Sequence, residues 1–414
     1  MLILPSDADP VEEYAAAEMA AHVKQVTMIE PQIVHATDSE IQRACAGEAN
    51  LLVLGRVKNN MLLRRLAKVK FFKANSNDQG YTLRTATNIF DKTNRTWLAV
   101  LCGKDPRGVL YAVRDFMHFH FYRTNTGPRL EYFRFSHAPT IKVRYLSESG
   151  CNLFSAENDD PDFMRKPSRN GYSHNVVFDK QYYLDWLSHC KITHLNMVWC
   201  NATAYDRAWN QMVAYARSRG IQVWRHYVPY RPQHEYPPEH ISSVPPSSSE
   251  GDCPRDRETQ TWYLNRLKQM VMQKPLIAGI VIESPYHDSV YCHCEQCRGK
   301  ENPYSEKLML EEFVTLARGL RPDLQIIRVT KNPISDQDTA VRIAEELQGI
   351  SEKVDFNINT FVDRKHRIRW HDLGYEYGTY LRTYRSALKG KNVEKEVNFL
   401  YQDFQSSVNR GVIV

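Results

Sequence analysis

The first part of the chain mixes apolar runs with amphipathic stretches. The segment LILPSDADPVEEYAAAEMAAHVKQV predicts a short strand and then a helix, with Asp9 as its N-cap and Pro10 at its first position. A second helix of the same kind starts in DPRGVLYAVRDFM. Between the two helices, the apolar run NLLVLG predicts a strand, and GYTLRTA and TWLAVLCG alternate like paired strands. Residues 1–136 therefore indicate a small α/β domain.

From Ile141 onward, apolar runs alternate with helical stretches. The runs are IKVRYLSES, ITHLNMVWC, IQVWRHYVPY, IAGIVIES, LQIIRVT and VDFNINTFVD. Strands that alternate with helices predict parallel β/α units, so residues 137–414 favour a (β/α)8-type TIM barrel, which usually has roughly 250 residues. The run GVIV (residues 411–414) is a candidate seventh strand, and an eighth is missing, so we expect the barrel to be incomplete at the C-terminus. An open doubly wound sheet is the alternative.

The composition narrows the class of protein. With 414 residues, 42% of them hydrophobic and 25% charged, the chain is typical of a soluble globular protein with two domains. The net charge of +6 comes from 54 basic and 48 acidic residues, a balance that does not favour a nucleic-acid partner. No run approaches the ~20 consecutive apolar residues of a membrane span, so we expect no membrane partner. The start MLILPSDADP lacks signal-peptide features, so the chain is either cytoplasmic or secreted or periplasmic with its signal removed.

The segment GIVIESPYHDSVYCHCEQCRGK (residues 279–300) joins a buried strand, a lone carboxylate and three cysteines. The pattern puts Glu283 at the carboxyl end of the fourth barrel strand, where the active sites of such barrels lie. Apolar surroundings disfavour the charged carboxylate, so we expect Glu283 to have a raised pKa and to act as a general acid. A structural ion pair with a loop arginine such as Arg298 is the alternative.

The cysteines of this segment have the spacing Cys-x-Cys-x-x-Cys, and a further cysteine lies in the Pro- and Ser-rich loop 231–254. The candidate ligands of one tetrahedral Zn²⁺ are Cys253, Cys292, Cys294 and Cys297. Four sulfur ligands predict a structural zinc that holds the loops around Glu283, and we expect no organic cofactor. Free or disulfide-bonded thiols and an iron–sulfur cluster are alternatives, and His287 and His293 can substitute as ligands.

Aromatic and polar residues gather at the ends of other predicted strands. Flat rings beside hydrogen-bonding groups suit a sugar ring, although any one of these aromatics can equally belong to the core. The candidates for substrate contact are Trp199, Asn201, His226, Tyr230 and, in the loop after the fourth strand, His287. A glycosidase needs two carboxylates. Asp363 is the candidate partner of Glu283, with Glu148 and Glu235 as alternatives.

Three motifs carry a family resemblance: GVLYAVRDFM at the end of the N-terminal unit, PTIKVRYL at the join, and the cysteine cluster after a strand-four acid with CP upstream. The chain resembles glycoside hydrolases that combine a hexosaminidase-like N-terminal domain with a catalytic barrel, such as families 20 and 67. It is more similar still to the endo-β-N-acetylglucosaminidases of family 163. The resemblance implies that residues 1–136 form an accessory domain, that residues 137–414 form the catalytic barrel, and that Glu283 is the acid/base. It also implies that Arg144 binds sugar hydroxyl groups.

One position departs from family 20. Those enzymes carry an Asp directly before the acid Glu, where it orients the acetamido group of the substrate, whereas Ile282 stands here. We therefore expect a glycoside hydrolase that cleaves an oligosaccharide or polysaccharide, with N-acetylglucosamine-containing glycans as one candidate class. A non-catalytic glycan-binding or scaffold barrel with a structural zinc site is the first alternative, and a metalloenzyme that uses the cysteine cluster directly is the second. The oligomeric state is open.

Overall fold

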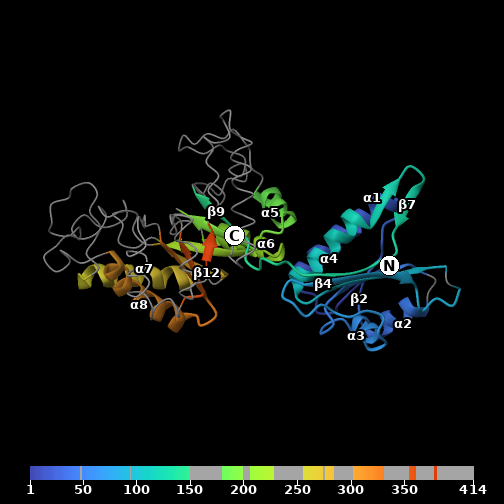
Figure 1. Cartoon of the computed structure of the whole chain (residues 1–414), viewed down its shortest axis with the longest axis horizontal. Helices are drawn as coiled ribbons and strands as arrows, with labels where there is room; N and C mark the ends of the chain where they lie inside the picture. Colours follow the sequence, from blue (N-terminus) through green and yellow to red (C-terminus); the bar gives the residue numbers. More distant parts are fainter. Residues whose placement is uncertain are drawn as a thin grey trace. The chain divides into compact units, whose positions relative to one another are not determined.

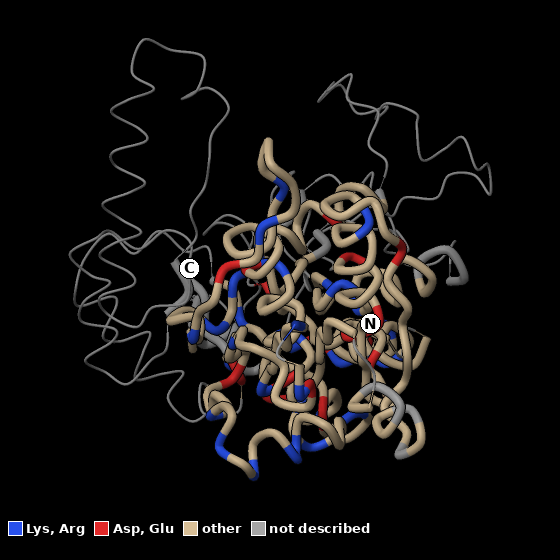
Figure 2. The backbone as a smooth tube through the Cα atoms, turned by 90° about the vertical axis from the view of Figure 1, so that its right-hand side faces the viewer, with Lys and Arg blue, Asp and Glu red and all other residues tan. Residues whose placement is uncertain are grey.

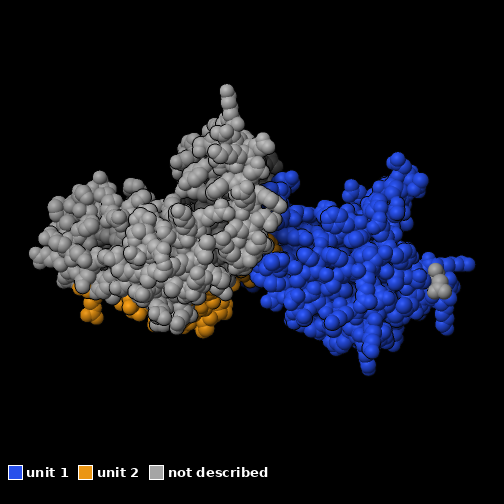
Figure 3. Space-filling model, in the orientation of Figure 1, with its two compact units in different colours: residues 1–142, 181–193, 215–221 blue, residues 143–180, 194–214, 222–414 orange. Residues whose placement is uncertain are grey.

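The computed structural model of the protein describes residues 1–46, 49–93, 95–149, 180–198, 206–227, 255–273, 276–283, 302–330, 354–359 and 377–379. The chain divides into two compact units, which Figure 3 colours separately. Unit 1 comprises Met1–Lys142, Gln181–Thr193 and Tyr215–Ile221, and unit 2 comprises Val143–Lys180, His194–Ala214 and Gln222–Val414. Unit 1 thus includes two short segments from far along the chain. The roles predicted for residues 1–136 and 137–414 stay predictions.

Unit 1 contains a mixed six-stranded sheet with the order β2-β1-β3-β5-β4-β8. Its strands are β1 (Leu2–Leu4), β2 (Ile33–His35), β3 (Leu51–Gly55), β4 (Tyr81–Thr87), β5 (Trp97–Gly103) and β8 (Arg134–His137). Strands β2, β1, β3 and β5 are parallel, and β4 pairs antiparallel with both β5 and β8. The predicted pairing of GYTLRTA with TWLAVLCG is confirmed. Strands β6 (Phe121–Thr124) and β7 (Gly127–Leu130) form a separate antiparallel ribbon.

Helices cover both faces of this sheet (Figure 1). They are α1 (Pro10–Thr27), α2 (Asp38–Ala46), α3 (Met61–Lys68) and α4 (Pro106–Phe119). Successive residues of a strand point to opposite faces, so Leu2 and Leu4 pack with α1 and α4, whereas Ile3 packs with α2 and α3. Two apolar cores result, one on each face of the sheet.

Two helices of unit 1 begin where the sequence predicts. Asp9 is the N-cap of α1 and accepts a hydrogen bond from the Val11 amide, with Pro10 at the first helical position. Asp105 caps α4 in the same way, accepting from the Gly108 amide at 2.9 Å. Both predicted helix starts are therefore confirmed.

A buried ion pair joins the start of α1 to the loop after β3. The Glu12 carboxylate, which is 0% exposed, accepts hydrogen bonds from Nε and Nη2 of Arg56 at 2.8 and 2.9 Å. The same carboxylate accepts from the Asp9 amide at 2.9 Å and from the Asn59 amide group at 3.1 Å. Because a buried charge is tolerated only when it is paired and hydrogen-bonded, this set of donors makes the burial of Glu12 possible.

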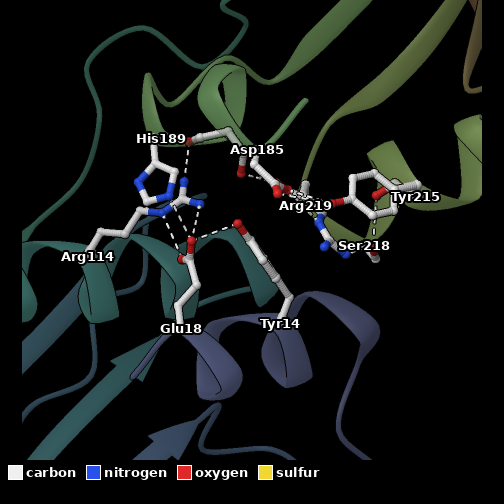
Figure 4. A network of polar contacts seen from close by, with 9 residues as sticks. Tyr14, Glu18, Arg114, Asp185, His189, Tyr215, Ser218 and Arg219 are labelled. Carbon is white, nitrogen blue, oxygen red and sulfur yellow. Dashed lines mark hydrogen bonds and ion pairs between the residues drawn. The ribbon is translucent and has the colours of Figure 1, made fainter. Parts of the chain in front are cut away.

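Two later segments complete unit 1: Gln181–Thr193, which contains nearly all of one helix, and Tyr215–Ile221, which contains the end of the next. Figure 4 draws their contacts with α1 and α4. The Glu18 carboxylate on α1 accepts from Tyr14 at 2.7 Å, from Nε2 of His189 at 2.8 Å and from Nε of Arg114 at 3.2 Å. Burial alone would raise the pKa of this carboxyl, but the hydrogen bond from His189 and the charge of Arg114 outweigh it and lower the pKa to about 2. Glu18 is therefore a charged acceptor at the centre of the network.

Arg219 forms the other half of the network in Figure 4. Its Nε atom donates to Asp185 at 2.9 Å, and its guanidinium lies over the rings of Tyr14 and Tyr215 at 4.1 and 3.7 Å from their centroids. Tyr215 also donates to Asp185 at 3.0 Å. Residues 181–193 and 215–221 are thereby bound to the N-terminal part of unit 1 by paired charges and stacked rings.

Unit 2 is built on a parallel sheet in which the described strands follow one another in chain order, from β9 to β15. These strands are β9 (Tyr145–Ser149), β10 (His194–Val198), β11 (Gln222–Tyr227), β12 (Gly279–Glu283), β13 (Gln325–Thr330), β14 (Phe356–Asn359) and β15 (Tyr377–Thr379). All neighbours are parallel. The six predicted strands are confirmed, β15 was not predicted, and the GVIV candidate at residues 411–414 lies outside the described residues.

The order of the strands in this sheet distinguishes between the two predicted architectures. A doubly wound sheet reverses its strand order at a switch point, whereas a barrel adds each strand beside the previous one. The described strands follow the second pattern, with helices α5 (Lys180–His189), α6 (Asp206–Ser218), α7 (Arg257–Gln273) and α8 (Asn302–Leu320) between them. Among the described strands no pairing joins β15 to β9, so closure into a barrel stays a prediction.

Charge and hydropathy add two observations on the described part of the chain. Figure 2 marks Lys and Arg positions with Asp and Glu positions among them along the described backbone. None of the described helices combines the length and the apolar character that crossing a membrane requires.

Candidate active site

Glu283 is the last residue of β12 and lies at the carboxyl edge of the unit 2 sheet. Side chains alternate along a strand, so Val281 and Glu283 share one face, and Ile280 and Ile282 share the other. Val281 belongs to an apolar cluster with Trp224 of β11 and neighbouring residues of β13. The Glu283 carboxyl group thus follows directly after a layer of packed apolar side chains. The predicted strand-end position is confirmed.

His226 of the neighbouring strand β11 contacts this carboxyl group. Its Nε2 atom lies 2.5 Å from Oε2 of Glu283, and the two side chains are 3% and 1% exposed. In the register of β11 and β12, His226 stands opposite Val281, so Glu283 lies diagonally one step closer to the carboxyl edge. A histidine on the adjacent strand is therefore in contact with Glu283. Arg298, considered above as its ion-pair partner, lies outside the described residues.

Asn196 of β10 continues the arrangement by one strand. Its amide nitrogen Nδ2 lies 3.2 Å from Nδ1 of His226, and the Asn196 residue is 3% exposed. An amide nitrogen only donates, so Nδ1 accepts with its lone pair. A neutral imidazole then carries its proton on Nε2, the ring nitrogen that lies next to the Glu283 carboxyl group. Three neighbouring strands thus bring Asn196, His226 and Glu283 into successive contact.

A polar layer lies on the same sheet face, nearer the amino ends of the strands. Nε2 of His194 lies 2.7 Å from Oε1 of Gln222, and Nε1 of Trp224 donates to Oε1 of Gln325 at 2.8 Å. The rings of His194 and Trp224 lie 4.4 Å apart. Trp224 is 1% exposed, so of the two interpretations of the strand-end aromatics, the core one applies to Trp224. This layer therefore packs beneath the carboxyl edge of the sheet, and the rings of His194 and Trp224 are buried in it.

The opposite face of the same strands packs against helices of unit 2. The hydroxyl group of Tyr227 donates to the carbonyl oxygen of Tyr263 on α7 at 2.7 Å. The Tyr227 ring lies 5.7 Å from that of Phe313 on α8, edge to face. This packing fixes the strand segment that carries His226.

The other predicted site residues are divided between two places. Arg144 directly precedes β9, at the amino-terminal edge of the sheet, whereas Glu283 ends β12 at the carboxyl edge. The structure therefore brings His226 to Glu283 but sets Arg144 at the other edge, and its role in sugar binding stays a prediction. Five predicted residues lie outside the described residues: Trp199, Asn201, Tyr230, His287 and Asp363.

The predicted zinc ligands also lie outside the described residues; they are Cys253, Cys292, Cys294 and Cys297. Within the described part of the chain, no group of three or more His, Cys, Asp or Glu residues is arranged to hold a metal ion. Cys45, Cys102 and Cys190 are free thiols there. The structural zinc stays a prediction.

Sequence reasoning named His226 as a sugar ligand and did not name Asn196. Both contacts depend on how β10, β11 and β12 align, and an apolar-polar pattern does not determine the register between strands. One signal was available. Asn196 and His226 are polar residues inside otherwise apolar strands, which indicates a buried hydrogen-bonded partner.

Solved glycoside hydrolase structures share this fold at low sequence identity. The GH20 chitobiase of Flavobacterium johnsoniae matches with a TM-score of 0.57 and 12% identity, over 92% of this chain and 55% of that one. A GH20 exo-β-N-acetylglucosaminidase of Vibrio harveyi, in an inactive mutant form, matches with a TM-score of 0.57 and 9% identity, over 91% and 56%. A GH138 enzyme that targets pectin rhamnogalacturonan II matches with a TM-score of 0.55 and 9% identity, over 92% and 52%.

The likeness to these proteins concerns the fold. The chain spans between 52% and 56% of the length of the three structures, and a GH84 protein shares the fold at a TM-score of 0.55 and 57% of its length. Neither a protein-family model nor a curated protein sequence matches the chain. The predicted resemblance is therefore confirmed for a fold that several glycoside hydrolase families share, whereas membership of family 20, 67 or 163 stays a prediction.

Proposed function

We propose that the protein is a glycoside hydrolase and that Glu283 protonates the oxygen of the scissile glycosidic bond. The proposal rests on one observation: a single carboxyl group ends the fourth strand of the parallel sheet and is held by a histidine from the third. In parallel β/α barrels, residues at the carboxyl ends of the strands carry out the chemistry. The fold shared with GH20, GH84 and GH138 proteins supports the same reaction class.

His226 and Asn196 have a defined part in this proposal. When Glu283 gives its proton to the leaving oxygen, a carboxylate forms in a buried site, where charge is disfavoured. Nε2 of His226 lies 2.5 Å from Oε2 of that carboxylate, so a proton on this nitrogen stabilises the charge as it appears. Asn196 holds the proton of His226 on Nε2 because its amide group occupies Nδ1. The pair therefore favours the product side of the proton transfer.

The second group of the reaction and the substrate class belong to the proposal as well. Glycoside hydrolysis needs a base or nucleophile opposite the acid, and Asp363 is the candidate within this chain. Ile282 precedes Glu283, so the chain lacks a carboxylate at the position that orients an acetamido group in family 20. We propose glycans that contain N-acetylglucosamine as the first substrate class to test, because two of the similar structures are GH20 enzymes named for chitobiose or N-acetylglucosamine.

A non-catalytic glycan-binding barrel with a structural zinc site is the second candidate function. The observation that favours it is the burial of Glu283, which is 1% exposed and lies in contact with His226. A glycosidic oxygen must come within about 3 Å of an acid that protonates it. A structural role for the Glu283–His226 pair requires no such approach.

Hydrolysis and binding assays with matched variants decide between the two functions. The full chain is incubated with N-acetylglucosamine-containing and uronic-acid-containing glycans, alongside Glu283→Gln and the control Glu311→Gln, which changes an exposed residue of α8 in the same unit. The enzyme proposal expects hydrolysis by the wild type and the control, and its loss in Glu283→Gln with binding retained. Glycan binding without hydrolysis by the wild type supports the second candidate.

The proposed zinc is tested separately. Metal analysis of the purified chain is expected to find about one zinc per chain, and substitution of Cys294 by Ser is expected to lower that content. A chain free of zinc whose four cysteines all react with a thiol reagent under native conditions would contradict the site. A structural zinc, unlike a catalytic one, is expected to affect folding and activity together when a chelator removes it.

A further inference from the structure

Arg107 joins two main-chain carbonyl groups of unit 1 that stand just before neighbouring strands. Its Nε atom donates to the carbonyl oxygen of Gly220 at 2.6 Å, and its Nη2 atom donates to that of Thr193 at 3.3 Å. The chain passes from Thr193 directly into β10, and from Gly220 through Ile221 into β11. One guanidinium group therefore ties together the points at which β10 and β11 begin.

The helix that carries Arg107 is firmly held. Arg107 lies in the first turn of α4, whose N-cap Asp105 accepts from the amides of Gly108 at 2.9 Å and of Gln79 at 2.6 Å. A Cβ atom added at Gly108 would lie 2.4 Å from the carbonyl oxygen of Gly80, so the helix start packs directly against that loop. The guanidinium group is thus mounted on a helix start that is fixed on two sides.

The accepting carbonyl groups are equally well defined. Gly220 has a φ of +76°, a left-handed conformation that favours glycine, and its amide donates to the carbonyl oxygen of Arg217 at 3.0 Å. A Cβ atom at Gly220 would lie 3.3 Å from Cγ of Arg107, so glycine also permits the close approach of this side chain. The turn before β10 is closed by the Ile192 amide, which donates to Leu187 at 3.0 Å.

A second arginine of α4 reinforces the first. Arg114, two turns further along the helix and 1% exposed, donates from Nη1 to the carbonyl oxygen of Ser188. The hydroxyl group of Ser188 donates in turn to the carbonyl oxygen of Arg219 at 2.5 Å. The segments that lead into β10 and β11 are thereby linked to α4 and to each other.

We propose that Arg107 is a positioning residue for Glu283, acting through Asn196 and His226. Asn196 lies three residues after Thr193 and His226 lies six after Gly220, so at a rise of about 3.3 Å per residue the two side chains stand about 10 and 20 Å along their strands. The Arg107 hydrogen bonds join the residues that precede the same two strands on which Asn196 and His226 make contact. They fix the starts of both strands and, with them, the alignment on which that contact depends.

The consequence for catalysis rests on the proposed function, but the consequence for geometry does not. A register shift of one residue turns a side chain to the opposite face of a sheet, and even a smaller shift changes a hydrogen bond. Loosening of the Arg107 contacts is therefore expected to disturb the Nε2–H group of His226 at Glu283. The residue touches neither a reacting atom nor the substrate, and acts only on the position of groups that do.

The test compares Arg107→Met and Arg107→Lys with the control Arg64→Met in the full chain. Arg64 also donates to a main-chain carbonyl oxygen, that of Lys58 at 2.7 Å, but on α3, away from the segments that lead into β10 and β11. In Arg107→Met we expect amide hydrogen exchange in β10 and β11 to quicken by about tenfold or more and the ¹⁵N resonance of His226 Nε2 to move. With a glycan that the wild type hydrolyses, kcat is expected to fall by about tenfold to a hundredfold while KM stays within about twofold.

Each outcome of this experiment counts for or against the proposal. Arg107→Lys can reach one carbonyl group but not both, so intermediate exchange rates and a partly restored resonance support it. Unchanged exchange and an unchanged His226 resonance in folded Arg107→Met overturn it, and so does an equal effect in Arg64→Met. If Arg107→Met does not fold, Arg107→Lys is judged by the same two measurements. A wild type that hydrolyses no glycan contradicts the proposed function alone, because exchange and the resonance still decide the positioning.

Discussion

His226 and Glu283 meet across neighbouring strands through Nε2 and Oε2, which lie 2.5 Å apart. The contact is diagonal, because His226 stands opposite Val281 in the register. It joins the only two ionisable side chains that the described part of β11 and β12 presents on this face of the sheet. The strength of the contact therefore depends on both the protonation of His226 and the acceptor at residue 283.

Substitutions of Glu283 are expected to separate stability from catalysis. Glu283→Gln keeps a carbonyl oxygen for His226, so we expect the free energy of unfolding to fall by about 1 kcal/mol, whereas Glu283→Ala removes the acceptor and is expected to cost about 3 kcal/mol. Urea unfolding measures both. The exposed control Glu311→Ala is expected to change the value by less than about 0.5 kcal/mol. Equal losses in Gln and Ala variants would show that the contact with His226 contributes nothing to stability.

Asn196→Asp is expected to change the protonation of His226. The Asn196 amide donates to Nδ1 and leaves the proton on Nε2, whereas an Asp carboxylate accepts there and favours a proton on both ring nitrogens. At neutral pH the ¹⁵N resonance of Nδ1 is expected to move from an unprotonated to a protonated value. Asn210→Asp on α6 is the control and is expected to leave His226 unchanged. An Nδ1 that already carries a proton in the wild type contradicts this arrangement.

Loss of the buried Glu12 carboxylate is expected to destabilise unit 1 strongly. Glu12→Ala leaves the Arg56 guanidinium, whose side chain is 12% exposed, without its two carboxylate bonds. Breaking such a pair costs about 3 to 5 kcal/mol. Chemical unfolding followed by circular dichroism measures the loss, with Glu13→Ala, the exposed next residue of the same helix, as the control. A loss below about 1 kcal/mol would mean that solvent replaces Glu12 readily.

The stability of unit 1 is expected to depend on pH through Glu18. The pKa of this carboxyl is about 2 in the folded chain, against an ordinary value of 4.5. A depressed pKa gives a contribution that is complete above pH 4.5 and is lost as the pH falls towards 2; a shift of this size corresponds to about 3 kcal/mol. The difference in unfolding free energy between the wild type and Glu18→Gln should therefore shrink over this range. A constant difference contradicts the assignment.

The elements of the fold were largely predictable because their signals are local. Asp9 with Pro10, and Asp105 with Pro106, carry the chemistry of a helix start within two residues. Strands β10 to β13 of unit 2 are largely apolar runs, and most of their described residues are buried, as is typical of parallel strands. By contrast, β15 (Tyr377–Thr379) has three residues and no apolar run, so it left no signal to detect.

The site was predictable only in part because its contacts join distant residues. Glu283 followed from the end of its own strand, whereas the approach of His226 depends on pairing between residues more than fifty positions apart in the chain. The inclusion of residues 181–193 and 215–221 in unit 1 has the same cause. Arg107 and Arg114 hold these two segments in unit 1 by donating to main-chain oxygens. Every residue has such an oxygen, so no sequence pattern marks the contact.

The composite make-up of unit 1 limits how such a protein can evolve by exchange of gene segments. A recombination point after Lys142 looks suitable on the sequence, yet it would separate α4 from the segments 181–193 and 215–221 that complete its surroundings. Arg114, 1% exposed in the whole chain, would lose the oxygen of Ser188 in the shortened product. Transplantation of the N-terminal part onto another β/α domain should therefore succeed only when the recipient brings matching residues on its first two helices.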